Sequence, residues 1–205
     1  MHVEGDFSAD GYAVIRRIAS AEICEKMVEK VWADLRSDEL RTVATPHKLL
    51  TKPTIEVRGQ DSPSLTHFHW ALTAAVEAAT GLELLPSYCH FRLYWGGDIL
   101  RVHSDRVASQ VSLSLTLGYS DGLPWEIRIG TRPVSSESPV EDHFGDEPSV
   151  SVMMQTGDAL LYRGAMLRHG RLTPNPNKWS AHLFAMWVER GGEYESLAFE
   201  RLAPN

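Results

Sequence analysis

A histidine and an aspartate stand one residue apart in the stretch YWGGDILRVHSDR, residues 94–106, directly after a short apolar run. Two imidazoles and one carboxylate on one face of an Fe(II) ion leave its other positions open for reactants. A chain with nine histidines also contains such spacings by chance, and the pair would then be only a polar turn between strands. His103 and Asp105 therefore predict a metal site only if a second histidine converges on them.

The second histidine comes from the stretch GDALLYRGAMLRHGR, residues 157–171. His169 stands there at the end of a loop, where a new β-type run opens, and four strands fit between it and His103. If the two runs lie side by side, His103, Asp105 and His169 form a set of two imidazoles and one carboxylate. Such a set has the ligand types that a metal ion of this kind requires.

Two helices are expected ahead of the strands that must carry these residues. Apolar residues recur at helical spacing over residues 20–35, with Ser20 as the N-cap. A second helix is predicted to begin at Ser62-Pro63 and to stop at Gly81. His67 and His69 fall two positions apart on this second helix, so we expect them on different faces, as surface or capping side chains.

From residue 84 onward the sequence breaks into short β-branched and aromatic runs separated by Gly, Asp, Pro and Asn. The eight expected strands are YCHFRLYW, DILRVH, SQVSLSLTLGY, WEIRIG, VSVMMQ, DALLYRG, RHGRLT and WSAHLFAMWVE, with ESLAFERL as a tail. This pattern predicts a mainly β fold with flanking helices, in which a jelly-roll core carries the N-terminal helices on one sheet. We expect one domain over 1–205, with the strand and helices in 1–83 and the β-core in 84–190.

Alternate residues of two of these strands form polar faces. Such a face is either solvated or lines a partly wet cavity, and the sequence leaves both readings open. The predicted inward residues are Tyr88, His90, Arg92 and Tyr94 on the first strand, and Lys178, Ser180, His182, Phe184 and Met186 on the last. We expect Asp158 to fix a turn and Trp125 to belong to the core.

Residues 131–149 are rich in Ser, Pro and acidic side chains and exceed the usual length of a connection. They predict a mobile loop, which is either a lid or an insertion without a role. The acidic residues between Glu137 and Glu147 favour a cationic substrate.

Composition excludes several classes of partner. The chain has 205 residues with 20 Lys and Arg against 27 Asp and Glu, a net charge of -7 and no basic run, so no nucleic-acid partner is expected. No stretch approaches the about 18 apolar residues of a membrane span, and the first residues lack a signal-peptide pattern. Cys24 and Cys89 lie in apolar patterns and predict buried free thiols, which suits a cytoplasmic protein.

The spaced residues together resemble the Fe(II)/2-oxoglutarate-dependent dioxygenase superfamily, and most of all its prolyl-4-hydroxylase-like and phytanoyl-type members. The likeness rests on the motif of Tyr94, Gly97, His103 and Asp105, and on a later set, Gly157-Asp158, ALLYRG, His169 and Lys178-Trp179-Ser180. The opening FSADGYAVIRRI is also similar to the strand that leads into a helix at the start of these proteins.

The resemblance implies a double-stranded β-helix core, the jelly-roll fold that cupins share, with Fe(II) bound by His103, Asp105 and His169. It implies that Lys178 and Ser180 bind the far carboxylate of 2-oxoglutarate, assisted by Tyr94. Lys offers a point charge where many relatives have the fork of Arg, so Arg171, Arg128 and Arg106 stay open as alternatives.

The implied reaction consumes O2 and 2-oxoglutarate, releases succinate and CO2, and hydroxylates an unactivated C–H bond of a peptide side chain, amino acid or small metabolite. Asp105 argues against the halogenating branch, whereas desaturation, cyclisation and epimerisation stay open, as does ascorbate as an auxiliary reductant. His90, Arg92, His182 and Arg106 are candidates for substrate contact or for an inner hydrogen-bond network.

Two further readings remain. A metal-dependent cupin-like isomerase or dioxygenase would use the same barrel without 2-oxoglutarate, which the basic-x-Ser feature at Lys178 and Ser180 disfavours. A non-catalytic binding module would keep only the fold, which an intact metal set disfavours.

Overall fold

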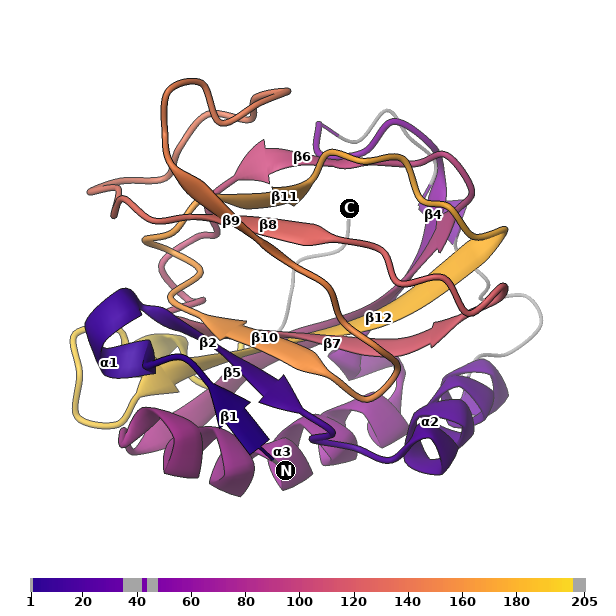
Figure 1. Cartoon of the computed structure of the whole chain (residues 1–205). Coiled ribbons are helices and arrows are strands. Elements are labelled where there is room, and N and C mark those ends of the chain that lie inside the picture. Colours follow the sequence, from indigo (N-terminus) through magenta and orange to yellow (C-terminus); the bar gives the residue numbers. More distant parts are fainter. Residues whose placement is uncertain (1, 35–41, 44–47, 201–205) are drawn as a thin grey trace.

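The computed structural model describes residues 2–34, 42–43 and 48–200, and its strands form two antiparallel sheets that face one another (Figure 1). The larger sheet has the strand order β1-β2-β10-β7-β12-β5-β4-β3, and the smaller sheet has the order β6-β11-β8-β9. The larger sheet contains β1 (His2–Glu4), β2 (Tyr12–Arg16), β3 (Thr42–Val43), β4 (Thr54–Arg58), β5 (Leu84–Trp95), β7 (Val111–Tyr119), β10 (Ala159–Tyr162) and β12 (Trp179–Glu189). The smaller contains β6 (Leu100–His103), β8 (Ile127–Gly130), β9 (Ser149–Val152) and β11 (His169–Arg171). All eight predicted strands are present, and the jelly-roll prediction is confirmed.

Two long helices cover the outer face of the larger sheet, α2 (Ala21–Asp34) and α3 (Pro63–Thr80) (Figure 1). Both begin at the predicted caps, since Ser20 Oγ accepts the Ile23 N–H and Ser62 Oγ accepts the Leu65 N–H. The second ends at Gly81, whose φ of 72° lies in the left-handed region. Neither α2 nor α3, nor any shorter described helix, is long and apolar enough to cross a bilayer.

Alternate side chains of each strand point into two different regions of the interior. Phe91 and Leu93 of β5 pack into the apolar layer between the larger sheet and the helices, while Arg92 and Tyr94 turn toward the space between the sheets. The layer on the helix side also buries Cys24 and Cys89 as free thiols, as predicted, and burial raises their pKa values to about 11 and about 12. The inner face of β5 is thus free to carry polar side chains.

The N-terminal segment departs from the prediction. The opening FSADGY was expected to be part of a strand, but Phe7–Asp10 forms the short helix α1. Asp6 caps this helix by accepting the Ser8 and Ala9 N–H groups, and Gly11 ends it with a φ of 76°. The strand itself begins only at Tyr12, where it pairs with β10.

The strand β4 was not predicted from the sequence. It lies between β5 and β3 in the larger sheet, and its pairing with β5 places Glu56 opposite Arg92 and Arg58 opposite His90. Two short 3-10 turns, η1 (Gly59–Asp61) and η2 (Glu195–Leu197), complete the described elements, and η2 falls within the predicted tail.

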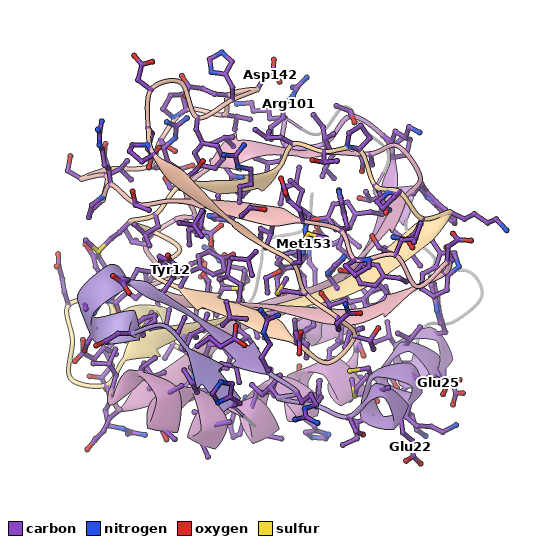
Figure 2. All side chains as sticks on the ribbon, in the orientation of Figure 1. Tyr12, Glu22, Glu25, Arg101, Asp142 and Met153 are labelled. Carbon is purple, nitrogen blue, oxygen red and sulfur yellow. The ribbon has the colours of Figure 1, made fainter. Side chains whose placement is uncertain are left out.

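The segment from 131 to the start of β9 lacks long regular structure but is tied to the barrel rim. Ser104 and Ser138 exchange hydrogen bonds of 2.9 and 2.8 Å through backbone and side chain. Arg168 forms ion pairs with Glu141 and Glu147, and Arg101 lies 2.8 Å from Asp142, the pair labelled at the top of Figure 2. These contacts fix where the loop lies, and its mobility stays a prediction.

Gly157 occupies a position that excludes a side chain. Its φ is 88°, and a Cβ atom would collide with the carbonyl oxygen of Ala19. The next residue, Asp158, fixes the turn as predicted, accepting the Gln155 N–H at 3.1 Å and binding Arg16 at 2.9 Å.

We predict that Gly157→Ala lowers the free energy of unfolding by about 2–4 kcal/mol, because strain and overlap add together. Gly122→Ala is the matched control, since Gly122 also has a positive φ of 67° but nothing lies within 4 Å of its Cβ position. Its expected cost is about 1 kcal/mol. Urea unfolding of both variants measures the difference, and equal losses would show that overlap with Ala19 contributes nothing.

Candidate metal centre

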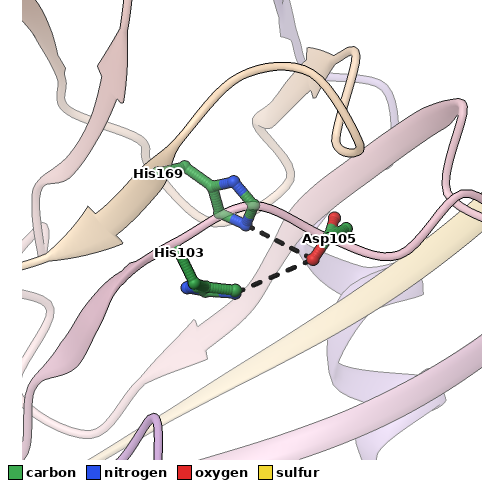
Figure 3. A group of neighbouring side chains, drawn as sticks. All are labelled: His103, Asp105 and His169. Atoms are coloured by element: carbon green, nitrogen blue, oxygen red, sulfur yellow. Dashed lines mark ion pairs between the residues drawn. The ribbon is translucent and has the colours of Figure 1, made fainter. Parts of the chain in front are cut away.

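Two neighbouring strands of the smaller sheet bring the predicted ligands together. His103 is the last residue of β6, His169 is the first of β11, and the two are paired across the sheet with ring centroids 4.4 Å apart. Asp105 follows β6, and its Oδ1 lies 3.7 Å from Nε2 of His103 and 3.6 Å from Nε2 of His169 (Figure 3). The three ligand atoms lie within 4.8 Å of one another, so one metal ion can contact all of them.

Backbone carbonyls orient both imidazoles. Nδ1 of His103 lies 2.8 Å from the carbonyl oxygen of Arg101, and Nδ1 of His169 lies 3.0 Å from that of Leu167. A neutral imidazole that donates from Nδ1 presents the lone pair of Nε2, which is the form that binds metal. With Nδ1 held by a carbonyl in each ring, both rings direct Nε2 toward Asp105.

The carboxylate is held equally firmly. Ser112 on β7 donates a 3.0 Å hydrogen bond to Oδ2 of Asp105, while the backbone N–H of Asp105 donates to the carbonyl of Gly164 at 2.8 Å. Oδ1 stays available for a metal. A Cβ atom on Gly164 would overlap both Ser112 and Asp105, so a glycine is required beside the site.

The surroundings of His103 favour its neutral form. Burial, followed by the neighbouring His169, lowers the pKa of His103 to about 3. The hydroxyl of Tyr162 on β10 lies 3.3 Å from Nε2 of His169. Two imidazoles and one anchored carboxylate are the donor set that suits Fe(II) with open coordination positions, so the residues present fit this metal.

A cavity of about 640 Å³ opens beside the three ligands. The wall opposite them comes from β5 and β12, and the rim includes part of the 131–149 segment. The lining includes Tyr88, His90, Arg92, Phe184 and Met186 from the wall, with Glu137, Ser138 and Val140 from the rim. The polar face predicted for β5 therefore lines a cavity.

Lys178 does not lie in the barrel, contrary to the sequence-based prediction. Its side chain is 86% exposed, and Nζ lies 4.0 Å from Oδ1 of Asp121. Strand alternation holds only within a strand, and β12 begins one residue later, at Trp179. Ser180 and His182 do point inward and are fully buried.

Arg171 is the basic residue that the fold brings deepest into the barrel. It follows His169 on the same face of β11, is 0% exposed, and lies over the Trp125 ring at 4.8 Å. Its Nη1 donates to the carbonyl of Trp125, and its Nη2 lies 3.5 Å from Nδ1 of His182. Among the described residues, no carboxylate forms an ion pair with this guanidinium.

Several polar atoms of the barrel interior have no hydrogen-bond partner among the described residues. Nε of Arg171, Nε2 of His182 and Oγ of Ser114 are all buried without a hydrogen-bond partner within the described part of the chain. Ser114 stands two residues after Ser112 on β7, so these atoms extend from the metal ligands into the barrel. A buried cation beside unsatisfied polar atoms is what a missing anionic group would satisfy.

The other candidate residues differ in whether they reach the cavity. Arg128 donates to Ser149 at 2.8 Å, away from the cavity lining, whereas Arg106 lines the cavity and pairs with Glu200 at 2.7 Å. The buried Tyr94 hydroxyl accepts a 3.2 Å hydrogen bond from Arg92. The Ser180 hydroxyl is close to a side-chain amide, with Asn175 donating at 3.0 Å, and Trp125 is core, as predicted.

The histidines of α3 divide between surface and core. His67 is exposed, as predicted, but His69 is buried against the ring of Trp187 at 4.6 Å, contrary to the prediction. Burial lowers the pKa of His69 to about 4. Periodicity along the helix did not reveal that β12 covers this position.

Solved structures that resemble this chain show which known fold it has. No protein-family model matches the chain, and no curated protein matches it in sequence. A Pseudomonas putida prolyl-4-hydroxylase aligns with a TM-score of 0.60 at 18% identity, covering 91% of this chain and 96% of the other.

A carbocyclase dependent on alpha ketoglutarate, SnoK from nogalamycin biosynthesis, aligns with a TM-score of 0.67 at 11% identity over 97% and 91% of the two chains. HygX from Streptomyces hygroscopicus, solved with nickel, 2-oxoglutarate and hygromycin B, aligns with a TM-score of 0.64 at 14% identity over 89% and 84%. The chain has the fold of the Fe(II)/2-oxoglutarate oxygenases, the superfamily that its motifs resemble.

Ser112 gives a direct test of the metal centre. We predict that Ser112→Ala weakens divalent metal binding by about 10- to 100-fold, because Asp105 loses the hydrogen bond that orients it. Competition titration with Fe(II) or Co(II) under anaerobic conditions measures the affinity. Ser114→Ala is the control, since its hydroxyl faces the same interior without touching Asp105, and a similar loss in both variants would contradict the assignment.

Proposed function

We propose that this protein is an oxygenase that depends on Fe(II) and 2-oxoglutarate. The observation that carries the proposal is the convergence of His103, Asp105 and His169, each fixed by a further hydrogen bond, at the mouth of a cavity. Bound iron would supply the oxidising chemistry, in which O2 and 2-oxoglutarate give succinate, CO2 and an oxidised substrate. The chain's own residues bind and orient the two organic reactants.

Arg171 is the residue that we assign to the far carboxylate of 2-oxoglutarate. Its charge is buried without an acidic partner among the described residues, and it shares the inward face of β11 with His169. His182 and Ser114 supply further unpartnered polar atoms, while Tyr94 and Ser180 lie in the same interior. We therefore assign to Arg171 the role that the sequence predicted for Lys178, whose ammonium group points to solvent.

The remaining part of the cavity would hold the substrate. We propose hydroxylation of an unactivated C–H bond in a small molecule, amino acid or peptide side chain as the outcome, because nothing beyond positioning is needed for it. The buried, unpaired Arg171 favours this reading over a cupin-like enzyme without 2-oxoglutarate, which would leave that charge uncompensated.

Anaerobic addition of Fe(II) and then 2-oxoglutarate tests the proposal. We expect a visible absorption band on binding and succinate release once O2 is admitted. His103→Ala and Asp105→Ala are each expected to abolish metal-dependent succinate release, because two ligands hold the ion poorly. Activity that survives in both variants would refute the proposal.

Arg171 and Lys178 can be compared directly. We predict that Arg171→Met raises the Kd for 2-oxoglutarate by about 100-fold, because the carboxylate loses the buried cation assigned to it. Arg171→Lys should recover part of this loss, and Lys178→Met should change nothing. Titration of the absorption band with 2-oxoglutarate gives the Kd of each variant. An unchanged metal affinity shows that the variant is folded. The opposite ranking would return the role to Lys178.

A further inference from the structure

The hydroxyl of Tyr162 lies beside an atom that a metal ion must use. It is 3.3 Å from Nε2 of His169, the same atom that lies 3.6 Å from Oδ1 of Asp105. Nδ1 of His169 is held by the Leu167 carbonyl, which can only accept a hydrogen bond, so Nδ1 carries a hydrogen. In the form of the ring that binds metal, Nε2 has a lone pair, and the Tyr162 hydroxyl donates to it.

Metal binding takes this acceptor away from Tyr162. An imidazole nitrogen has a single lone pair, so Nε2 cannot bind a metal ion and accept a hydrogen bond at the same time. Among the described residues, His169 is the only hydrogen-bond partner of the Tyr162 hydroxyl. The metal-loaded site would therefore contain a buried hydroxyl that needs a new acceptor.

Packing leaves the Tyr162 side chain little freedom to turn away. The residue is 1% exposed, its ring belongs to the apolar cluster that also contains Ile129 and Leu167, and the ring centroid lies 4.6 Å from that of His169. Its backbone is paired on both sides, with β2 and with β7. The new acceptor must therefore come to the hydroxyl, beside the metal ligands.

Ser112, which lies opposite Tyr162 on β7, has a different relation to the ligands. Its hydroxyl donates to Oδ2 of Asp105 and leaves Oδ1 for the metal, so this hydrogen bond survives metal binding. Tyr162 instead contacts the ligating atom itself. The ring of His169 also keeps its orientation without Tyr162, because the Leu167 carbonyl holds Nδ1. The Tyr162 hydroxyl is therefore not needed to support the ligand set.

We propose that metal binding releases the Tyr162 hydroxyl from His169, and that the hydroxyl then donates a hydrogen bond to the keto-acid end of 2-oxoglutarate at the metal. This inference rests on the proposed function. Tyr162 lines the cavity and lies within electrostatic reach of both Asp105 and Arg171, which stand at the two ends of the space assigned to the cosubstrate. The keto-acid end carries a carboxylate, and hydrogen bonds to a charged acceptor are stronger than those to a neutral one.

The variant Tyr162→Phe separates this role from support of the ligands. Co(II) replaces Fe(II), so that calorimetry measures binding without turnover. We expect the variant to bind Co(II) at least as tightly as the wild-type protein, because the metal no longer displaces a hydrogen bond. The Kd of the Co(II)-loaded variant for 2-oxoglutarate should rise by about 10- to 100-fold, because the hydrogen bond to the charged keto-acid end is lost.

Two comparisons locate the contact on the cosubstrate. Oxalate chelates a metal through two adjacent oxygens, as the keto-acid end does, but it has no far carboxylate. Tyr162→Phe should therefore weaken oxalate binding by about 10-fold or more, whereas Arg171→Met should leave it unchanged. Tyr88→Phe is the matched control, because Tyr88 lines the same cavity and its hydroxyl lies 2.8 Å from Oγ of Ser109. It should leave the affinities for Co(II), 2-oxoglutarate and oxalate unchanged.

A Co(II) affinity that falls by about 10-fold or more in Tyr162→Phe would show that the hydroxyl supports the ligands, and it would overturn the inference. An unchanged affinity of this variant for 2-oxoglutarate or for oxalate would also overturn it, as would losses of the same size in Tyr88→Phe. Failure of the proposed function has a different signature. In that case 2-oxoglutarate would not bind to the metal-loaded wild-type protein, and both proposals would be refuted together.

Discussion

The antiparallel pairing of β6 with β11 is the constraint on which the site depends. It places His103 opposite His169, and a slip of one residue would turn one of the two imidazoles to the other face of the sheet. Gly170 lies so close to β6 that a Cβ atom would come within 2.8 Å of the Leu100 carbonyl oxygen. The same close approach keeps His169 and Arg171 on one inward face, so the metal ligands and the buried cation are positioned by a single strand pair.

Much of this arrangement follows from local sequence patterns. Caps such as Ser62 and alternation along strands such as β5 are encoded within a few residues, which is why the helices and the eight strands could be predicted. The convergence of His103, Asp105 and His169 was expected instead from the spacing of a motif. The failures involve contacts between distant segments. The position of Lys178 depends on where β12 begins, and that of His69 on its packing against Trp187 of β12. β4 is no shorter than predicted strands such as β6, but it stands apart from them in the sequence, between the two long helices. Ser112 and Tyr162 were missed because their partners come from other strands.

The charges of the buried residues Arg92 and Arg171 are compensated in different ways. Arg92 has a carboxylate from β4 beside it, so its burial is compensated within the protein. Arg171 has aromatic rings, a neutral imidazole and a carbonyl around it, and these compensate a buried charge less well. Burial of such a group lowers stability unless an anion binds, and under the proposed function that anion is the far carboxylate of 2-oxoglutarate.

The elements that hold the metal differ from those that shape the rest of the cavity. β6 and β11 are neighbours in the smaller sheet, and β7 lies inside the larger one, so register and packing restrict their inward residues. Ser138 comes instead from the long connection before β9. Loops tolerate change more readily than the elements that they connect. Substrate choice can therefore vary through the rim segment while the residues supplied by β6, β7 and β11 stay in place.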